Sequence, residues 1–318
     1  MMGENNLKNF FNIENRTKYF VHLLIFLSVF SFVIFILLLL NNKSVNKKEN
    51  IVVKNKTDLF KDIILEGKSA IVWDVINKRE LFSKNPDLPL PLASLTKVMT
   101  AITMSENLPN SSNIEITAEF LEPEGDSKLK IGDSWQTDDL RDFTLLTSSN
   151  DGAFALASIS QNKNIEKKNN HFQFIKSMND LASKIGLTNS RFFNEHGLDR
   201  QVDRGGAYGS AKDMALLFEY TLKNEPQILE ATRYKNLKFT TKEQTYEAEN
   251  TNSVLDKIPG LMASKTGYTD LAGGNLIIAY DAGLNRPIII SVLGSTAEGR
   301  FIDTLKLVEA SLKYIQQN

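Results

Sequence analysis

Ser94 and Lys97 carry the pair of side chains best suited to covalent chemistry. They lie three positions apart at the start of an expected apolar helix, so one helical turn would bring the hydroxyl and the amine together. A lysine desolvated there can be neutral and accept the hydroxyl proton, which would make Ser94 a nucleophile. The same S-x-x-K spacing recurs at three other places, Ser44/Lys47, Ser127/Lys130 and Ser160/Lys163. Only Ser94 combines the spacing with a helix start and an apolar helix that could bury the pair.

Two further motifs follow along the chain. The S-S-N segment at 148–150 falls in the break between two expected helices, where a helix cap and a turn would also explain it. The chain contains a single K-[ST]-G segment, formed by Lys265, Thr266 and Gly267 on an expected strand. There the lysine would supply positive charge, the threonine a hydroxyl, and the glycine a bare backbone against which a substrate can lie. The alternative for this segment is an ordinary edge strand that ends in a turn.

The composition excludes several other kinds of site. The chain has no Cys, which rules out thiolate metal sites, disulfides and cysteine nucleophiles. It has three His, too few for most histidine-based metal sites, and we expect His171 at the surface and His196 in a structural turn. We therefore expect no metal, no cofactor and a catalytic base of another type, such as lysine. The net charge is −1, without the basic excess of nucleic-acid-binding proteins, so we expect no nucleic acid partner.

The elements that must position these residues alternate between strand and helix patterns. Strands are expected at 69–75, 79–83, 237–241, 264–269, 274–282 and 287–294. Helices are expected from Ser94 onward and at 137–146, 153–159, 172–185, 210–222 and 298–315. Strands at both ends around a helical middle predict an α+β fold, in which N- and C-terminal segments close one antiparallel sheet.

The N-terminal segment differs from the rest of the chain. Residues 19–40 contain no charged side chain and are long enough, at roughly 30 Å as a helix, to cross a bilayer. We interpret them as an uncleaved transmembrane signal anchor between a short cytoplasmic tail at 1–18 and a flexible tether at 41–60. The catalytic domain would then cover 61–318, on the extracytoplasmic side of a single-pass membrane protein. The count of flanking lysines and arginines does not support that topology, because more of them follow the span than precede it.

The order of the three motifs gives the sequence a family resemblance. S-x-x-K at a helix start, S-x-N between helices and K-T-G on a late strand form the signature set of penicillin-binding proteins and active-site-serine β-lactamases. Over roughly residues 65–312 the chain most resembles the low-molecular-mass serine D-alanyl-D-alanine carboxypeptidases. The segments that carry the resemblance are PLASLTKVMTA, LLTSSNDGAFALA, RFFNEHGLD, SAKDMALL and SKTGYTDLAGGNL. The resemblance implies a β-lactamase/transpeptidase-like fold with flanking helices and a helical subdomain.

The resemblance also implies a role for each motif residue. Ser94 would be the acylating nucleophile and Lys97 its general base. Ser148 and Lys265 would relay a proton to the leaving D-alanine, and Asn150 would position Lys97 and the substrate amide.

The remaining residues would bind the substrate. Thr266, with Lys265, would bind the terminal carboxylate, and Gly267 would line the substrate strand. The backbone N–H groups of Ser94 and Tyr268 would form the oxyanion hole. The partners implied are peptidoglycan stem peptides, β-lactams as covalent inhibitors, and the membrane through the N-terminal helix.

The sequence departs from the family pattern at two positions, and three alternative functions remain open. Many relatives have Gly where this chain has Ser149 and Ser264, which could alter substrate fit. A DD-endopeptidase would use the same residues as a carboxypeptidase. A serine β-lactamase is a second alternative, although no E-x-x-L-N segment follows Asn150 to supply a deacylating glutamate of the class A type. A catalytically inactive cell-wall-binding protein is the third.

Overall fold

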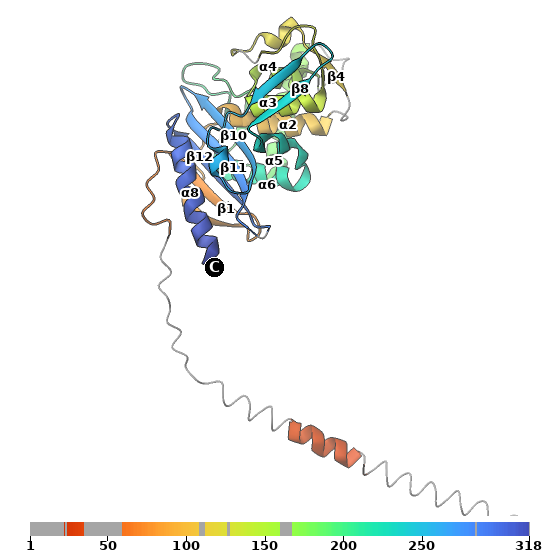
Figure 1. Ribbon diagram of the computed structural model, residues 1–318, viewed down its shortest axis with the longest axis vertical. Helices are drawn as coiled ribbons and strands as arrows, with labels where there is room; N and C mark the ends of the chain where they lie inside the picture. Colours follow the sequence, from red (N-terminus) through yellow and green to blue (C-terminus); the bar gives the residue numbers. More distant parts are fainter. Residues whose placement is uncertain are drawn as a thin grey trace, which may run out of the picture. The chain divides into compact units, whose positions relative to one another are not determined.

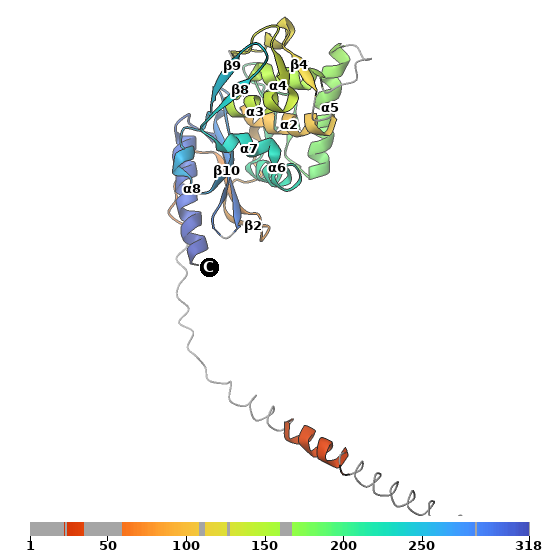
Figure 2. The ribbon, with the colours of Figure 1, turned by 45° about the vertical axis from the view of Figure 1, so that its right-hand side comes forward.

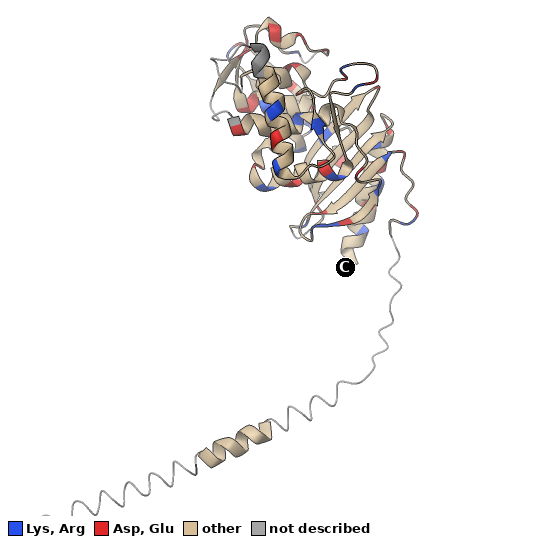
Figure 3. Ribbon diagram, turned by 180° about the vertical axis from the view of Figure 1, so that it is seen from behind, with Lys and Arg blue, Asp and Glu red and all other residues tan. Residues whose placement is uncertain are grey.

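The computed structural model describes residues 22, 24–34, 59–107, 112–125, 128–159, 167–283 and 285–317. The chain divides into two compact units, Met1–Thr57 and Asp58–Asn318. In the first unit, His22 and residues 24–34 are helical and carry no Lys, Arg, Asp or Glu (Figure 3). None of the helices described is both long enough and apolar enough to cross a membrane. The other residues of the predicted span, the tail at 1–18 and residues 41–58 of the predicted tether lie outside the described residues.

An antiparallel sheet of five strands forms the centre of the second unit. Its order is β10-β11-β12-β1-β2, so strands from both ends of the unit pair side by side. The strands are β1 (Ser69–Asp74), β2 (Arg79–Lys84), β10 (Leu261–Thr269), β11 (Gly273–Asp281) and β12 (Pro287–Ser295). The predicted α+β class and the closing of the sheet by N- and C-terminal segments are confirmed.

Helices cover both faces of this sheet (Figures 1 and 2). On one face, α8 (Gly299–Gln316) packs on Ile288, Ile290 and Val292 of β12. On the other, α6 (Ala211–Asn224) packs on the same strand, and Ile289 and Leu293 join the core with the helical region. Both faces of β12 are therefore buried, which explains why its sequence is a continuous apolar run instead of an alternating one.

The helical region contacts the sheet through α6 and, at β10, through α7 (Gln227–Glu230) and two 3-10 turns. It also contains α2 (Thr96–Asn107), α3 (Thr137–Thr147), α4 (Asn150–Ile159) and α5 (Lys167–Ile185). Local signals set several helix ends. Ser210 caps α6 by accepting the N–H of Asp213 at 3.1 Å, and Gly186 follows α5 with a left-handed φ of 89°.

Shorter strands complete the unit. β8 (Asn236–Thr240) matches an expected strand, whereas its hairpin partner β9 (Thr245–Glu249) was not predicted from the sequence. In β9, only Tyr246 and Ala248 are buried, against α3. The remaining short strands are β3 (Leu90–Pro91), β4 (Asn113–Glu115), β5 (Ser134–Gln136), β6 (Arg191–Phe192) and β7 (Ala207–Gly209). Positive and negative residues are interspersed along the side of this unit shown in Figure 3.

Candidate active site

Ser94 lies in a 3-10 turn, η1 (Ala93–Leu95), which leads directly into α2. Ala93 has a left-handed φ of 49°, and its carbonyl accepts a hydrogen bond from Thr96 Oγ1 at 2.7 Å. The sequence placed Ser94 at the cap or in the first turn of the helix, and the structure places it just before the helix. The turn leaves Ser94 partly exposed, while Lys97 in the first turn of α2 is 1% exposed.

The Lys97 amine contacts three oxygen atoms. Its Nζ lies 2.8 Å from Ser94 Oγ, 2.7 Å from Asn150 Oδ1 and 2.7 Å from the carbonyl oxygen of His196. The amide and carbonyl oxygens can only accept, so they engage two N–H bonds of the amine, whereas the serine hydroxyl can donate or accept. In the neutral amine, the lone pair therefore faces the Ser94 hydroxyl. This arrangement is suited to proton transfer from serine to lysine.

The S-S-N segment forms the break between α3 and α4. Ser148 ends α3 in the left-handed conformation, with φ 65° and ψ 31°. Asn150 Nδ2 donates to the carbonyl of Glu124 at 2.6 Å, which leaves its Oδ1 to accept from Lys97. The helix cap that the sequence suggested for this segment is formed by Ser149, whose Oγ accepts the N–H of Gly152 at 2.8 Å.

The K-T-G segment on β10 brings a second amine to the site. Lys265 Nζ donates to Ser148 Oγ at 2.9 Å and to the carbonyl of Thr266 at 2.9 Å. The hydroxyls of Thr266 and Thr251 lie 2.6 Å apart. The structure thus brings the three motifs together, with Ser94 and Lys97 from a helix start, Ser148 from a helix break and Lys265 from a strand.

Gly267 allows β10 to approach the turn that carries the serine. A Cβ there would lie 2.8 Å from the carbonyl oxygen of Leu92 and 3.1 Å from the backbone nitrogen of Ser94. From the sequence we expected the missing side chain to let a substrate lie against the strand. The structure shows that the packing of β10 on the serine turn also requires a glycine here. The Gly267 carbonyl accepts from Arg300 Nη1 at 2.8 Å, and the next residue, Tyr268, is half exposed.

Burial lowers the pKa of both amines. The pKa of Lys97 falls from 10.5 to about 7 because the side chain is desolvated, and the negative charges of Glu195 and Asp151 oppose the fall. Desolvation also lowers the pKa of Lys265 well below 10.5, and the neighbouring positive charges of Lys97 and Arg300 lower it further. Lys97 can therefore be neutral near pH 7, which an exposed lysine cannot, and Lys265 gives up its proton more readily than an exposed lysine does.

The sequence predicted a structural turn at His196 but not its contact with Lys97. The loop that contains this turn, 194–198, supplies the His196 carbonyl that accepts from Lys97. Its Gly197 has a φ of 85°, and a Cβ there would lie 1.9 Å from the carbonyl oxygen of Ala93. The side chain of His171 is 33% exposed and forms an ion pair of 2.6 Å with the buried Glu195. The glycine of NEHGLD was the one sequence signal of this close packing.

The buried Ser264 holds β10 against a neighbouring turn. The Ser264 N–H donates to Thr232 Oγ1 and its hydroxyl to the Thr232 carbonyl, each at 3.1 Å, so the serine ties β10 to the 3-10 turn η3 (Ala231–Arg233).

Within the part of the chain that the structure describes, no group of three or more His, Cys, Asp or Glu side chains could hold a metal ion.

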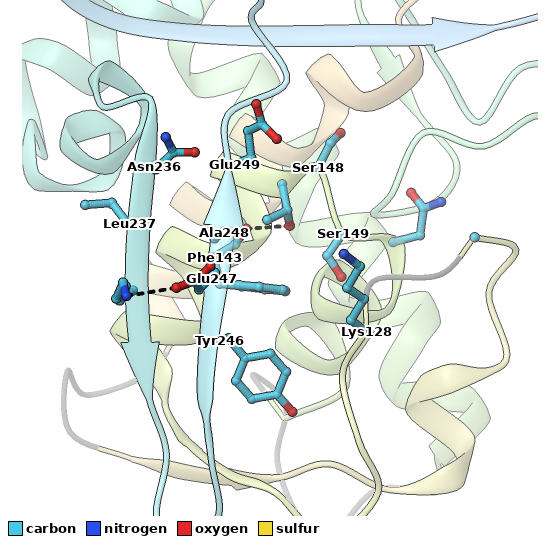
Figure 4. Close-up of a pocket in the computed structure, with 14 residues that line it drawn as sticks. Lys128, Phe143, Ser148, Ser149, Asn236, Leu237, Tyr246, Glu247, Ala248 and Glu249 are labelled. Atoms are coloured by element: carbon cyan, nitrogen blue, oxygen red, sulfur yellow. Dashed lines mark hydrogen bonds and ion pairs between the residues drawn. The ribbon is translucent and has the colours of Figure 1, made fainter.

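A cavity of about 880 Å³ opens beside the S-x-N turn. Figure 4 shows Ser148, Ser149 and Lys128 on one side of it and the β8–β9 hairpin on the other. Charged side chains of both signs line it, including Lys128, Lys238, Glu247 and Glu249. Its volume is in the range of sites that bind small molecules or short peptide segments.

Comparison with known proteins places the site in a family. The family model described as D-alanyl-D-alanine carboxypeptidase (peptidase S11) matches residues 55–297. This chain belongs to that family. The match includes η1, the S-x-N turn and β10, which carry all three motifs.

Individual relatives agree with this assignment. D-alanyl-D-alanine carboxypeptidase DacF of Bacillus subtilis is 28% identical over 250 residues, which are 77% of this chain and 61% of DacF. A D-alanyl-D-alanine endopeptidase of Pseudomonas aeruginosa is 30% identical over 253 residues, 76% of each chain. The chain thus spans about three fifths of DacF and three quarters of the endopeptidase.

Solved structures share the fold. The ampicillin-bound form of penicillin-binding protein D2 from Listeria monocytogenes superposes with a TM-score of 0.67 at 30% identity, over 78% of this chain and 98% of that one. A Streptomyces K15 DD-transpeptidase variant gives a TM-score of 0.71 at 22% identity, over 79% of this chain and 99% of that one. The second unit therefore has the penicillin-binding protein and transpeptidase fold.

Proposed function

We propose that this chain is a serine DD-carboxypeptidase that removes the terminal D-alanine from peptidoglycan stem peptides. The observation that carries the proposal is the contact of 2.8 Å between Lys97 Nζ and Ser94 Oγ. The oxygens of Asn150 and His196 accept the two N–H bonds of the neutral amine. Its lone pair is therefore left to accept a proton from the Ser94 hydroxyl.

The first step forms a tetrahedral intermediate. Ser94 Oγ attacks the carbonyl carbon of the penultimate D-alanine, and its proton passes to Lys97 Nζ. Negative charge develops on the carbonyl oxygen, where the backbone N–H groups of Ser94 and Tyr268 would stabilise it. Family membership supports these roles.

The second step releases D-alanine and leaves the shortened peptide as an ester on Ser94, the acyl-enzyme. The carbon–nitrogen bond breaks, and the leaving amine takes a proton through Ser148, whose hydroxyl accepts from Lys265 at 2.9 Å. Thr266 and Lys265 would hold the terminal carboxylate, and the cavity beside Ser148 would receive part of the stem peptide. Water then hydrolyses the ester on Ser94.

A labelled penicillin tests this assignment. The full chain in detergent is incubated with the penicillin, digested and analysed by mass spectrometry, and D-alanine release from a peptide ending in D-Ala-D-Ala is measured in parallel. We expect an adduct on the peptide that contains Ser94, and loss of both signals in Ser94→Ala. Ser127→Ala, another S-x-x-K serine, is the matched control and should keep both. A wild-type chain with neither adduct nor D-alanine release would refute the proposal.

The Pseudomonas relative, named an endopeptidase, supports a second candidate, cleavage of crosslinked peptides. Release of monomers from a crosslinked dimer, without D-alanine release from a monomeric pentapeptide, would favour the endopeptidase. Rapid penicillin turnover with no lasting adduct would favour a β-lactamase. Peptide turnover that persists in Ser94→Ala would point to activity from another source and an inactive fold.

We also propose that residues 19–40 anchor the chain in the cell membrane, with the catalytic domain extracytoplasmic. The uncharged stretch of 22 residues supports the anchor, and the location of peptidoglycan supports the side. β-Lactams are proposed as covalent inhibitors, because penicillin-binding protein D2 has been solved in ampicillin-bound and cefotaxime-bound forms. A reporter that is active only outside the cytoplasm, fused after Asn318, tests the topology; an inactive reporter on an expressed fusion would contradict it.

A further inference from the structure

A buried carboxylate lies behind the lysine of the proposed active site. The side chain of Glu195 is fully buried, which is costly for a charged group without partners. Its Oε2 lies 2.6 Å from His171 Nε2 and its Oε1 lies 3.5 Å from His196 Nε2. His171 belongs to α5, packs its ring 5.1 Å from that of Phe154, and has a side chain that is 33% exposed, against 15% for His196.

The backbone that carries Glu195 is tied to the helix of the lysine. Thr100 Oγ1 donates to the carbonyl of Glu195 at 2.6 Å, and Lys97 Nζ donates to the carbonyl of His196 at 2.7 Å. Lys97 and Thr100 are three residues apart on α2, so both bonds come from one face of that helix. A displacement of the Glu195 side chain would therefore move an acceptor of Lys97.

We propose that Glu195 and His171 form a positioning pair that couples the charge on His171 to the protonation of Lys97. The proposal rests on the proposed function, in which Lys97 is the base that deprotonates Ser94. Glu195 presents a negative charge to Lys97, and His171 offsets that charge when it is protonated.

Charged groups from three helices and one loop act on Glu195 or on Lys97. Glu195 is acted on by His171 on α5 and by His196 on its own loop, and Lys97 on α2 is acted on by Glu195 and by Asp151 on α4. His196 does not act as the switch, because burial lowers its pKa to about 4 and its Nδ1 accepts the N–H of Leu198. It is therefore neutral near pH 7, with its hydrogen on Nε2, which lies 3.5 Å from Glu195 Oε1. The hydrogen bond to Glu195 raises the pKa of His171 above its ordinary value, so His171 is the more readily protonated of the two histidines.

Replacing the two members of the pair should shift the pKa of Lys97 in opposite directions. Glu195→Gln removes the negative charge, so the Lys97 ammonium loses a stabilising partner and its pKa falls. His171→Gln keeps an N–H donor to Glu195 but removes the positive charge, so Glu195 acts on Lys97 without compensation and the pKa of Lys97 rises. A purely structural role would not give shifts of opposite sign.

The test measures the pH dependence of Ser94 acylation by a fluorescent penicillin. The full chain in detergent is compared with Glu195→Gln, His171→Gln and Asp74→Asn. Asp74 is a matched control, since it is a fully buried carboxylate at the end of β1, paired with Arg286 at 2.9 Å. We expect the acid limb to move down by about one pH unit in Glu195→Gln and up by about one in His171→Gln. It should stay in place in Asp74→Asn, and circular dichroism melts identify variants that fold.

A second measurement reads Lys97 without any reaction. NMR of [13Cε]-lysine protein, assigned with Lys97→Ala, follows the titration of Lys97 in the same four proteins and should show the same opposite shifts. Shifts of the same sign, or no shift in either folded variant, would overturn the proposed pair. A wild-type chain that takes no penicillin would instead contradict the proposed function, and the NMR titration would still decide the coupling.

Discussion

Gly197→Ala tests whether the 194–198 loop holds the lysine in place. The loop touches η1 so closely that an added Cβ would lie 1.9 Å from the Ala93 carbonyl oxygen, 2.5 Å from its carbon and 2.7 Å from Thr96 Oγ1. The neighbouring His196 carbonyl accepts from Lys97 at 2.7 Å. Relief of the clash must move either the loop or the turn that carries Ser94, and both movements change the geometry between lysine and serine.

The size of the effect follows from these contacts. Cβ atoms essentially never approach other atoms within 3.0 Å, so the two segments must separate by about 1 Å or more. Misplacement of reacting groups by about 1 Å can lower a rate by about 10²-fold. The left-handed φ of Gly197 adds strain of about 1–2 kcal/mol for any L residue with a side chain.

Gly186→Ala separates the clash from the strain. Gly186 has a φ of 89°, close to the 85° of Gly197, yet a Cβ there would meet no atom within 4 Å. Both variants should melt a few degrees below the wild type, about 2–4 °C for each kcal/mol in a domain of this size. Only Gly197→Ala should also lose about 10²-fold in its second-order rate of acylation by fluorescent penicillin.

Acylation rates and circular dichroism melts of the full chain in detergent check the two variants side by side. Equal acylation rates in Gly197→Ala and Gly186→Ala would refute the reasoning, because the clash would then have no effect on the lysine. A loss of acylation in Gly186→Ala would refute it as well, since that glycine lies at the end of α5 and has only strain to contribute.

Three further predictions concern the motif residues. Because burial lowers the pKa of Lys97 to about 7, the acylation rate of the wild type should be half-maximal near pH 7 and fall about tenfold per pH unit below it. Labelling with penicillin for fixed times between pH 5 and 9 measures this profile. A rate that does not change with pH would contradict a lysine base. Ser148→Ala should lower D-alanine release by about 10²–10⁴-fold, and an unchanged rate would exclude the hydroxyl from the proton path. Ser149→Ala should cost about 1 kcal/mol of stability through the lost cap at Gly152 while acylation stays within a few fold, so a large loss of acylation would contradict a capping role.

Local rules explain what the sequence could predict. The S-x-x-K contact spans one helical turn, and the apolar runs of β1, β11 and β12 have few alternatives to a buried sheet. The order of the three motifs supplied the rest through the family resemblance. Strand β9 was missed because its five residues, TYEAE, bury only Tyr246 and Ala248, and two apolar positions among polar ones are a weak strand signal.

Contacts between distant segments explain what the sequence could not predict. Lys97 and His196 are 99 residues apart, and no spacing rule indicates that the carbonyl of one meets the amine of the other. The same holds for the ion pair of Glu195 with His171, which the sequence predicted only as a surface residue. Ser149 and Ser264 departed from the family pattern, and their hydrogen bonds to Gly152 and Thr232 became visible only with the fold.

The two buried lysines differ in their surroundings, and the difference separates their proposed roles. Lys97 faces the negative charges of Glu195 and Asp151, which restore part of the proton affinity that burial removes. Lys265 faces the positive charges of Lys97 and Arg300, which remove more. A proton taken from Ser94 is therefore better held on Lys97, whereas a proton on Lys265 is more readily given to Ser148 and the leaving amine. In these proposed roles, a chain without Cys and with three His would obtain an acid and a base from one residue type, by placing each amine beside charges of a different sign.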